Sequence, residues 1–164
     1  MIQFMVGSTW FDARWRTYAH HAVEFRVPCR QRQGEDEMAC VAFLVGMAEN
    51  AIEIERVVID HKNWNFWCGF RKPCARFGLK TKFDGVNVKD VLRAVLELVR
   101  NGLERRGLGE EHYLEPLYRR LDCGVTPAQE AFVRWGNGGV EAFIEWAGYR
   151  QSSPGLRLVE RVRA

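Results

Sequence analysis

Residues 22–28 read AVEFRVP, a strict alternation of apolar and charged side chains. Because successive side chains of a β-strand point to opposite faces, Val23, Phe25 and Val27 share one face, and Glu24 and Arg26 share the other. The apolar face needs a covering layer, and we expect helices to supply it. The other face presents a carboxylate beside a guanidinium, although this alternation is also typical of an ordinary half-buried strand with a solvated polar face.

Length and composition are those of one globular domain with a substantial core. The chain has 164 residues, 47% of them hydrophobic, with six Trp and ten Phe, which excludes a disordered chain. No apolar run is long enough to cross a bilayer, and residues 1–6 lack the basic region and cleavage site of a signal peptide. The five cysteines form no CxxC pair, which predicts reduced thiols and no zinc site or disulfide framework. We therefore expect a cytoplasmic protein.

Strands come first along the chain, and helices follow. Short extended segments are predicted at residues 2–6 and 10–14, before the strand at 22–28. Amphipathic spacing, acidic first turns, and start and stop signals predict helices at 35–60, 88–106, 110–121, 127–135 and 140–146. Gly46, inside the first of these helices, indicates close packing against a neighbour. This order of elements is typical of the α+β class.

Residues 61–79 are aromatic, basic and interrupted by Gly69 and Pro73. Proline lacks the backbone N–H that a helix interior needs, so one regular helix is not expected here. Two interpretations fit the segment. It is either a loop held under the core by its aromatic side chains, or a cap over an anionic ligand with Arg71 or Arg76 on a phosphate.

A third interpretation of the same segment is a surface for RNA or DNA. Trp64, Phe66 and Trp67 would stack on bases, and the nearby arginines would contact phosphates. The net charge is only +3, and basic residues are interleaved with acidic ones along the chain. A nucleic-acid-binding domain usually gathers its basic residues on one face. Nucleic acid is therefore not the partner that we expect.

Five short motifs occur in a fixed order. They are FDAR at residues 11–14, VEFR at 23–26, ARFGL at 75–79, GVTPAQ at 124–129 and GG at 138–139, with a long helix predicted after the second. Their order and spacing resemble the C-terminal half of the glutamate–cysteine ligase type 2 family, ATP-dependent carboxylate–amine ligases related to glutamine synthetase. The resemblance covers residues 8–148. We accordingly assign residues 1–150 to the C-terminal half of such a catalytic domain and residues 151–164 to a tail.

The resemblance implies an antiparallel sheet that forms part of a glutamine synthetase-like catalytic funnel and is backed by helices. It also implies a step of glutathione biosynthesis, in which ATP phosphorylates the side-chain carboxylate of glutamate and an amine, commonly that of cysteine, attacks the γ-glutamyl phosphate. In this family the Glu of a Thr-x-Glu-x-Arg strand binds a divalent metal, and the Arg two residues later contacts the transferring phosphate. By position these residues are Glu24, expected to hold Mg²⁺ or Mn²⁺, and Arg26, expected to be catalytic.

The chemistry of phosphoryl transfer agrees with these roles. The protein gives little covalent help, whereas metals must bridge the phosphates and cations must stand where negative charge develops. A carboxylate is a natural ligand for Mg²⁺, and an arginine can bind phosphate oxygens in a bidentate manner. Arg14, Arg71 and Arg76 are the further arginines that we expect to contact the nucleotide.

Two features depart from the family pattern. Ala22 stands at the Thr position of the strand motif, so a hydroxyl contact is lost. The family's first half, with its paired glutamates, has no counterpart in this sequence, and Glu24 alone cannot hold several metals. We therefore expect the chain to be incomplete by itself: a fragment, a truncated relative, or a split subunit that needs an N-terminal partner or a homo-oligomer. The alternative is a non-catalytic interaction module.

Overall fold

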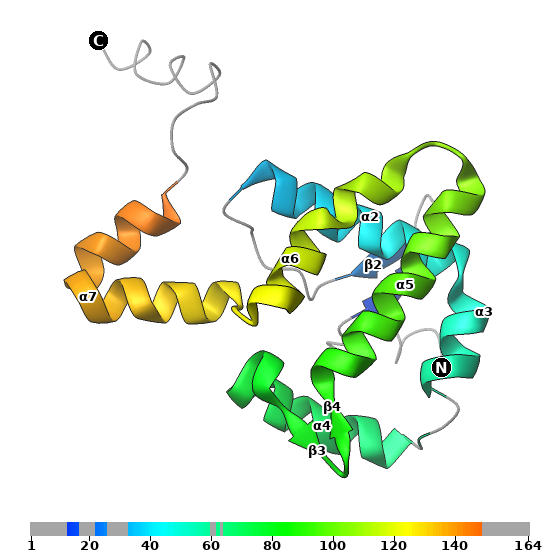
Figure 1. Cartoon of the computed structure of the whole chain (residues 1–164), viewed down its shortest axis with the longest axis horizontal. Helices are drawn as coiled ribbons and strands as arrows, with labels where there is room; N and C mark the ends of the chain where they lie inside the picture. The colour runs from blue at the N-terminus through cyan, green and yellow to red at the C-terminus, as the bar shows by residue number, and fades with distance from the viewer. Residues whose placement is uncertain (1–12, 17–21, 26–32, 60–61, 63, 149–164) are drawn as a thin grey trace. The chain divides into compact units, whose positions relative to one another are not determined.

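The computed structural model describes residues 13–16, 22–25, 33–59, 62 and 64–148 (Figure 1). The chain divides into two compact units, residues 1–31 and residues 32–164, and each is described by itself. Helices dominate the described residues, together with two small antiparallel sheets. The α+β class is thus confirmed. The catalytic funnel, and the assignment of residues 1–150 to half of a ligase domain, remain predictions.

The first unit contains a two-stranded antiparallel sheet. β1 (Ala13–Arg16) pairs with β2 (Ala22–Phe25), and the register places Arg14 opposite Glu24. The predicted strand at 22–28 is confirmed over residues 22–25, and the segment predicted at 10–14 overlaps the start of β1. The predicted strand at 2–6, and residues 26–28, lie outside the described residues.

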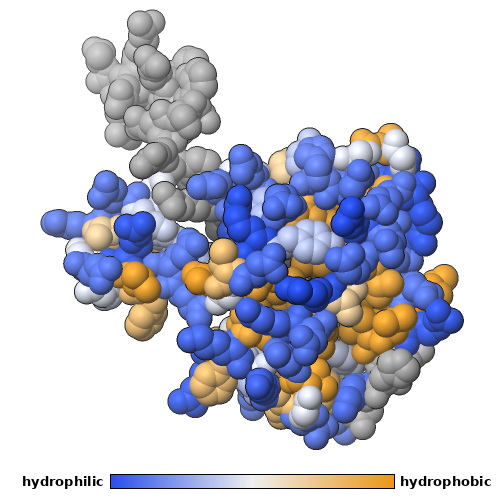
Figure 2. Space-filling model, in the orientation of Figure 1, coloured by the Kyte–Doolittle hydropathy of each residue, from blue (hydrophilic) through white to orange (hydrophobic). Residues whose placement is uncertain are grey.

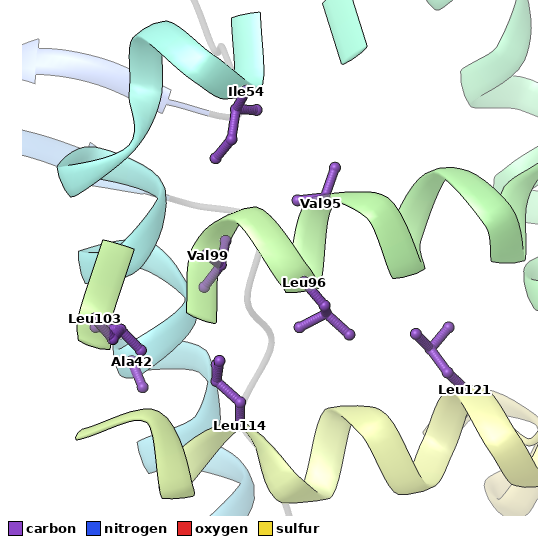
Figure 3. Close-up of a cluster of buried hydrophobic side chains, with 8 residues drawn as sticks. All are labelled: Ala42, Ile54, Val95, Leu96, Val99, Leu103, Leu114 and Leu121. Atoms are coloured by element: carbon purple, nitrogen blue, oxygen red, sulfur yellow. The ribbon is translucent and has the colours of Figure 1, made fainter. Parts of the chain in front are cut away.

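The second unit is organised around α5 (Val88–Arg106), whose bounds are those predicted. α2 (Gly34–Glu49), the 3₁₀ turn η3 (Glu110–Leu114) and α6 (Glu115–Cys123) pack against it. Figure 3 shows side chains from α5 and α6 pointing into the space between the two helices. The buried core consists of Ala42, Ile54, Val95, Leu96, Val99, Leu103, Leu114 and Leu121.

Two glycines let α2 and α5 approach each other closely. A Cβ atom added to Gly46 would lie 2.5 Å from the carbonyl oxygen of Val99, and one added to Gly102 would lie 2.7 Å from the carbonyl oxygen of Gly46. Neither distance is sterically allowed, so the two backbones touch at this crossing. The close packing predicted at Gly46 is confirmed, and its partner on α5 is another glycine.

The single helix predicted at 35–60 is wrong in its second half, because Asn50 interrupts it. α2 ends at Glu49, and the short helix α3 (Ala51–Ile54) and the π-helical turn η1 (Glu55–Ile59) follow. The buried Asn50 side chain donates to the Leu98 carbonyl of α5 at 2.7 Å and accepts from Arg105 at 2.8 Å. Asparagine is a weak helix former, and its two bonds to α5 stabilise the interruption.

A hairpin precedes α5. β3 (Lys82–Phe83) and β4 (Val86–Asn87) are joined by Asp84 and Gly85, where a turn was predicted. Both turn residues have positive φ, 47° and 75°, which is characteristic of a two-residue type I′ turn. The short 3₁₀ turn η2 (Gly78–Lys80) leads into the hairpin.

α4 (Trp64–Phe77) overturns the expectation that Pro73 prevents a regular helix. The proline lies inside the helix, where it cannot donate to the carbonyl four residues earlier. One face of α4 is nevertheless buried, because Phe66 and Phe70 pack against Phe83 with ring centroids 5.5 and 6.1 Å apart. We infer that burial of these aromatic rings outweighs the missing hydrogen bond.

The helix start and stop signals predicted for the C-terminal part of the chain are confirmed. The segment predicted as a helix at 110–121 is η3 followed by α6. Thr126 and Gln129 form a complete capping box at the start of α7 (Pro127–Ala147), and the helix is broken by non-helical dihedral angles at Gly138 and Gly139. None of the described helices combines the length and apolarity needed to span a membrane.

Candidate functional site

The first predicted site lies on the sheet of the first unit. Arg14 of β1 and Glu24 of β2 occupy directly opposed register positions, and opposed residues of an antiparallel pair share one face of the sheet. The predicted metal ligand and one predicted nucleotide-binding arginine are therefore neighbours across the ladder. Arg26, the predicted catalytic residue, lies outside the described residues.

Arg71 and Arg76 belong to the second unit, on α4, and both are exposed. Five residues of α-helix turn the chain by about 140° beyond a full turn, so the two arginines do not share one face. The guanidinium of Arg76 lies 5.3 Å from the centroid of the Phe77 ring. The structure thus brings Arg14 and Glu24 together, but it does not gather Arg71 and Arg76 at one point of α4.

Two of the aromatic side chains named in the nucleic-acid interpretation, Phe66 and Trp67, pack inside the second unit. Phe66 and Phe70 are buried in a second core cluster with Val88, and Trp67 packs beside them. Rings that are already packed in a core cannot stack on bases. The interpretation that aromatic side chains pack this segment against the core holds for Phe66, Trp67 and Phe70, although the segment is a helix and not a loop.

Sequence reasoning missed a pocket between α5, η3 and α6. This open pocket has a volume of about 360 Å³ and is lined by Arg100, Glu111, His112, Glu115 and Tyr118. The spacing of Glu111, Glu115 and Tyr118 places them on one face of a helical segment. That spacing was readable from the sequence, but Arg100 comes from another helix and no local pattern could have predicted its approach.

The pocket lining contains one buried polar atom without a partner among the described residues, Oε2 of Glu111. The hydroxyl of Tyr118 is also buried and lies within reach of Glu97 and Arg100 of α5. Burial, together with a hydrogen bond to Glu97 and the negative charge of that carboxylate, raises the pKa of Tyr118 from 10.0 to about 12. The phenol is therefore neutral at physiological pH and can both donate and accept a hydrogen bond. Nε of Arg100 donates to Glu104 at 2.8 Å.

Metal-binding clusters are not found among the residues that the structure describes. No group of three or more His, Cys, Asp and Glu side chains is arranged there to hold an ion. The chemistry of Glu24 fits a divalent metal, since an ionised carboxylate is a preferred ligand for Mg²⁺ or Mn²⁺. One carboxylate is an incomplete ligand set, so further ligands must come from elsewhere.

Comparison with known proteins finds partial similarity to several plant proteins. The chain is 36% identical over 93 residues to a chloroplastic protein of Medicago truncatula and 31% identical over 104 residues to one of Nicotiana tabacum, matches that cover 56% and 60% of this chain. It is 44% identical over 52 residues, 32% of this chain, to a protein of Oryza sativa subsp. japonica. All three are glutamate–cysteine ligases.

These matches cover only a small part of each plant protein. The aligned segments make up 18%, 20% and 11% of the Medicago, Nicotiana and Oryza proteins, so the chain spans about a fifth of these relatives or less. No family model matches the chain, and no solved structure does. The glutamate–cysteine ligase-like relationship is supported, and it extends over about 30–60% of this chain.

Proposed function

We propose that this chain provides the strand that binds metal and phosphate in an ATP-dependent glutamate–cysteine ligase-like reaction. The observation that carries the proposal is the 31–44% identity to plant glutamate–cysteine ligases. The opposed positions of Arg14 and Glu24 on the β1–β2 ladder support it, because phosphoryl transfer needs an anionic metal ligand and a cation near each other.

Each proposed residue has a separate task. Glu24 holds Mg²⁺ or Mn²⁺, and Arg26 contacts the phosphate that is transferred from ATP to the side-chain carboxylate of glutamate. A divalent metal held by Glu24 would supply the positive charge that offsets the negative charge developing on the phosphates. Arg14, Arg71 and Arg76 contribute positive charge toward the nucleotide. We propose that an N-terminal partner subunit or a second copy of the chain supplies the remaining metal ligands and binds the amine that attacks the γ-glutamyl phosphate.

Calorimetric titration of Mg-ATP into the whole chain tests the proposal. We expect Glu24→Gln and Arg26→Ala each to weaken binding by at least tenfold, because each removes a charge that contacts metal or phosphate. Glu130→Gln and Arg134→Ala are matched controls, since they make the same changes at exposed positions of α7 and should leave the affinity unaltered. Equal affinity in all variants, or no Mg-ATP binding by the unsubstituted chain, would overturn the proposal.

A second candidate function is that of an interaction module, and one specific observation favours it. None of the residues of α7 is buried, yet the helix carries large apolar side chains such as Phe132, 82% exposed, and Ile144, 62% exposed. In Figure 2 the surface over α7 combines hydrophobic and charged residues. We propose that α7 pairs with a second copy of the chain or with a partner chain.

A cytoplasmic location remains part of the proposal.

A further inference from the structure

Positive charge gathers on α4, η2 and β3 without carboxylates to balance it. Residues 61–82 contain six Lys and Arg and no Asp or Glu. Lys72, Arg76, Lys80 and Lys82, which we call the basic surface, are exposed, and none of them forms an ion pair with a described residue. Like charges at close range repel each other, so this surface is unfavourable for the isolated chain.

The cations of the basic surface border one junction, where β3 begins against the C-terminal half of α4. The hydroxyl of Thr81 donates at 3.1 Å to the carbonyl of Pro73, the residue that directly follows Lys72. Thr81 is 1% exposed, whereas its neighbours Lys80 and Lys82 are exposed, so these two lysines extend from the junction into solvent. The junction therefore presents its positive charges together to a partner.

Several cations elsewhere in the second unit are engaged within the fold. Arg93 of α5 pairs with Asp122 of α6, and Arg106 of α5 pairs with Glu49 of α2, both at 2.7 Å. These pairs connect helices of one chain to each other. The basic surface makes no such connection among the described residues, and its charge therefore suits an acidic partner from outside the chain.

The part of α7 beyond its glycine break carries the opposite charge. Glu141 and Glu145 are exposed and form no ion pair with a described residue, and Val140 and Ile144 are 50% and 62% exposed. The only Lys or Arg of α7, Arg134, lies before the break. Because residues four apart share one face of a helix, the two carboxylates form an acidic stripe beside an apolar one.

The spacing of the two surfaces matches. Lys72 and Arg76 are also four residues apart on the exposed side of α4, which places their Cβ atoms about 6 Å apart, as in the acidic stripe. Phe77, 53% exposed, lies beside Arg76, with its ring centroid 5.3 Å from the guanidinium. Two helices that lie side by side can therefore pair charges at two successive turns while their apolar side chains cover each other. An exposed ion pair alone contributes little, so apolar contact supplies the affinity and the charges set the orientation.

We propose that residues 140–147 of α7 dock on the basic surface of a second copy of the chain, with Glu141 and Glu145 facing Lys72 and Arg76. This inference rests on the proposed pairing of α7 and names the surface that α7 contacts. Charge complementarity favours a second copy, because one chain carries both surfaces and neither finds its counter-charge among the described residues of its own copy. Arg76 is also among the arginines proposed for the nucleotide, so docking of α7 and binding of a nucleotide at Arg76 exclude each other.

Sedimentation velocity of the whole chain at a series of protein concentrations tests the proposal. We expect the double variants Lys72→Glu/Arg76→Glu and Glu141→Lys/Glu145→Lys each to raise the dissociation constant of self-association at least tenfold, because like charges then face each other. An equimolar mixture of the two variants should associate again, since opposite charges meet in the mixed complex. Circular dichroism of each variant should show an unchanged fold. A mixture that remains dissociated would contradict the proposal.

A control separates the contact from the effect of net charge. Glu35→Lys/Glu130→Lys makes the same change of net charge as Glu141→Lys/Glu145→Lys, at exposed positions outside both surfaces, and should leave self-association unaltered. Equal weakening by this control would attribute the effect to net charge, and the docking proposal would be wrong.

Two further outcomes separate this inference from the proposed pairing of α7. Weakening by Ile144→Lys but not by Lys72→Glu/Arg76→Glu would keep α7 as the contact and overturn its placement on the basic surface. A chain that stays monomeric at every concentration would overturn the docking of a second copy. Binding of a fluorescently labelled single-stranded oligonucleotide, lost in Lys72→Glu/Arg76→Glu, would then make nucleic acid the occupant of the basic surface.

Discussion

The close contact between α2 and α5 at Gly46 and Gly102 is possible because both residues have a hydrogen atom in place of a side chain. A methyl group at position 102 would meet the carbonyl oxygen of Gly46 at 2.7 Å, and also the Cβ atoms of Glu49 and Asn50 at 3.3 Å. Backbone atoms cannot rotate away as side chains do. The two helices would therefore have to separate, and the packing of the whole core beside them would change.

We expect Gly102→Ala to lower the free energy of unfolding by about 1–3 kcal/mol, the usual cost of overpacking. The measurement is urea unfolding followed by circular dichroism. Gly136→Ala is the control, because a Cβ there meets nothing within 4 Å and alanine is the better helix former by about 1 kcal/mol. Equal effects of the two substitutions would show that the helices do not touch at this crossing.

Single residues were predictable where the reason for them is local. Gly46 was expected to pack closely because glycine in a helix interior costs free energy without such a contact, and Thr126 was expected to cap a helix because its hydroxyl and Gln129 are three residues apart. Asn50 and the pocket around Tyr118 were missed. Their partners, Leu98 and Arg100, lie on another helix, and a pattern within one segment carries no information about them.

At the scale of elements, α4 forms against its local sequence preference because it is packed, whereas α7 forms with favourable local signals and little packing. α4 contains Pro73 and persists because its aromatic face is buried. α7 contains no fully buried residue but has a complete capping box, in which the Thr126 backbone N–H donates to Gln129 at 2.8 Å and the Thr126 hydroxyl accepts from the Gln129 backbone at 3.3 Å. Local signals therefore predicted α7 correctly and α4 wrongly.

The capping box makes a testable prediction for α7. We expect Thr126→Ala to speed amide hydrogen exchange in residues 128–136, because loss of the cap costs the helix about 1 kcal/mol. The urea midpoint of the core should stay unchanged, since α7 contributes no buried residue to it. Thr126→Ser, which keeps the hydroxyl, is the control and should retain slow exchange. Faster exchange in α5 as well would contradict an independent α7.

At the scale of the whole molecule, the α+β class followed from the order of strand and helix patterns, while the funnel did not follow from anything in the described residues. The charged face of residues 22–28 indicated a function only when combined with motifs spread over the chain. The strand register adds information that alternation along one strand does not contain. The pairing of β1 with β2 places Arg14 opposite Glu24. A pattern within one segment of sequence cannot predict how the two units are arranged.

Exposure of α7 leads to a prediction about association. We expect sedimentation velocity of the chain to show concentration-dependent self-association, and Phe132→Lys or Ile144→Lys to weaken it, because each places a charge in an apolar surface. Ala128→Lys is the matched control at an exposed position of the same helix. A monodisperse monomer at high protein concentration would count against pairing of the chain with itself through α7.

Asn50 has a consequence for the order in which the second unit comes apart. Its amide binds the end of α2 to two positions of α5 that lie about two turns apart, the carbonyl of Leu98 and the side chain of Arg105. Asn50 itself lies about one turn beyond Gly46, which contacts α5 at Gly102. The hydrogen bonds of Asn50 and the backbone contact of Gly46 with Gly102 hold the same two helices together, so separation of α2 from α5 must break all of them. On heating, we therefore expect the contact between the end of α2 and α5 to be the last part of the second unit to unfold.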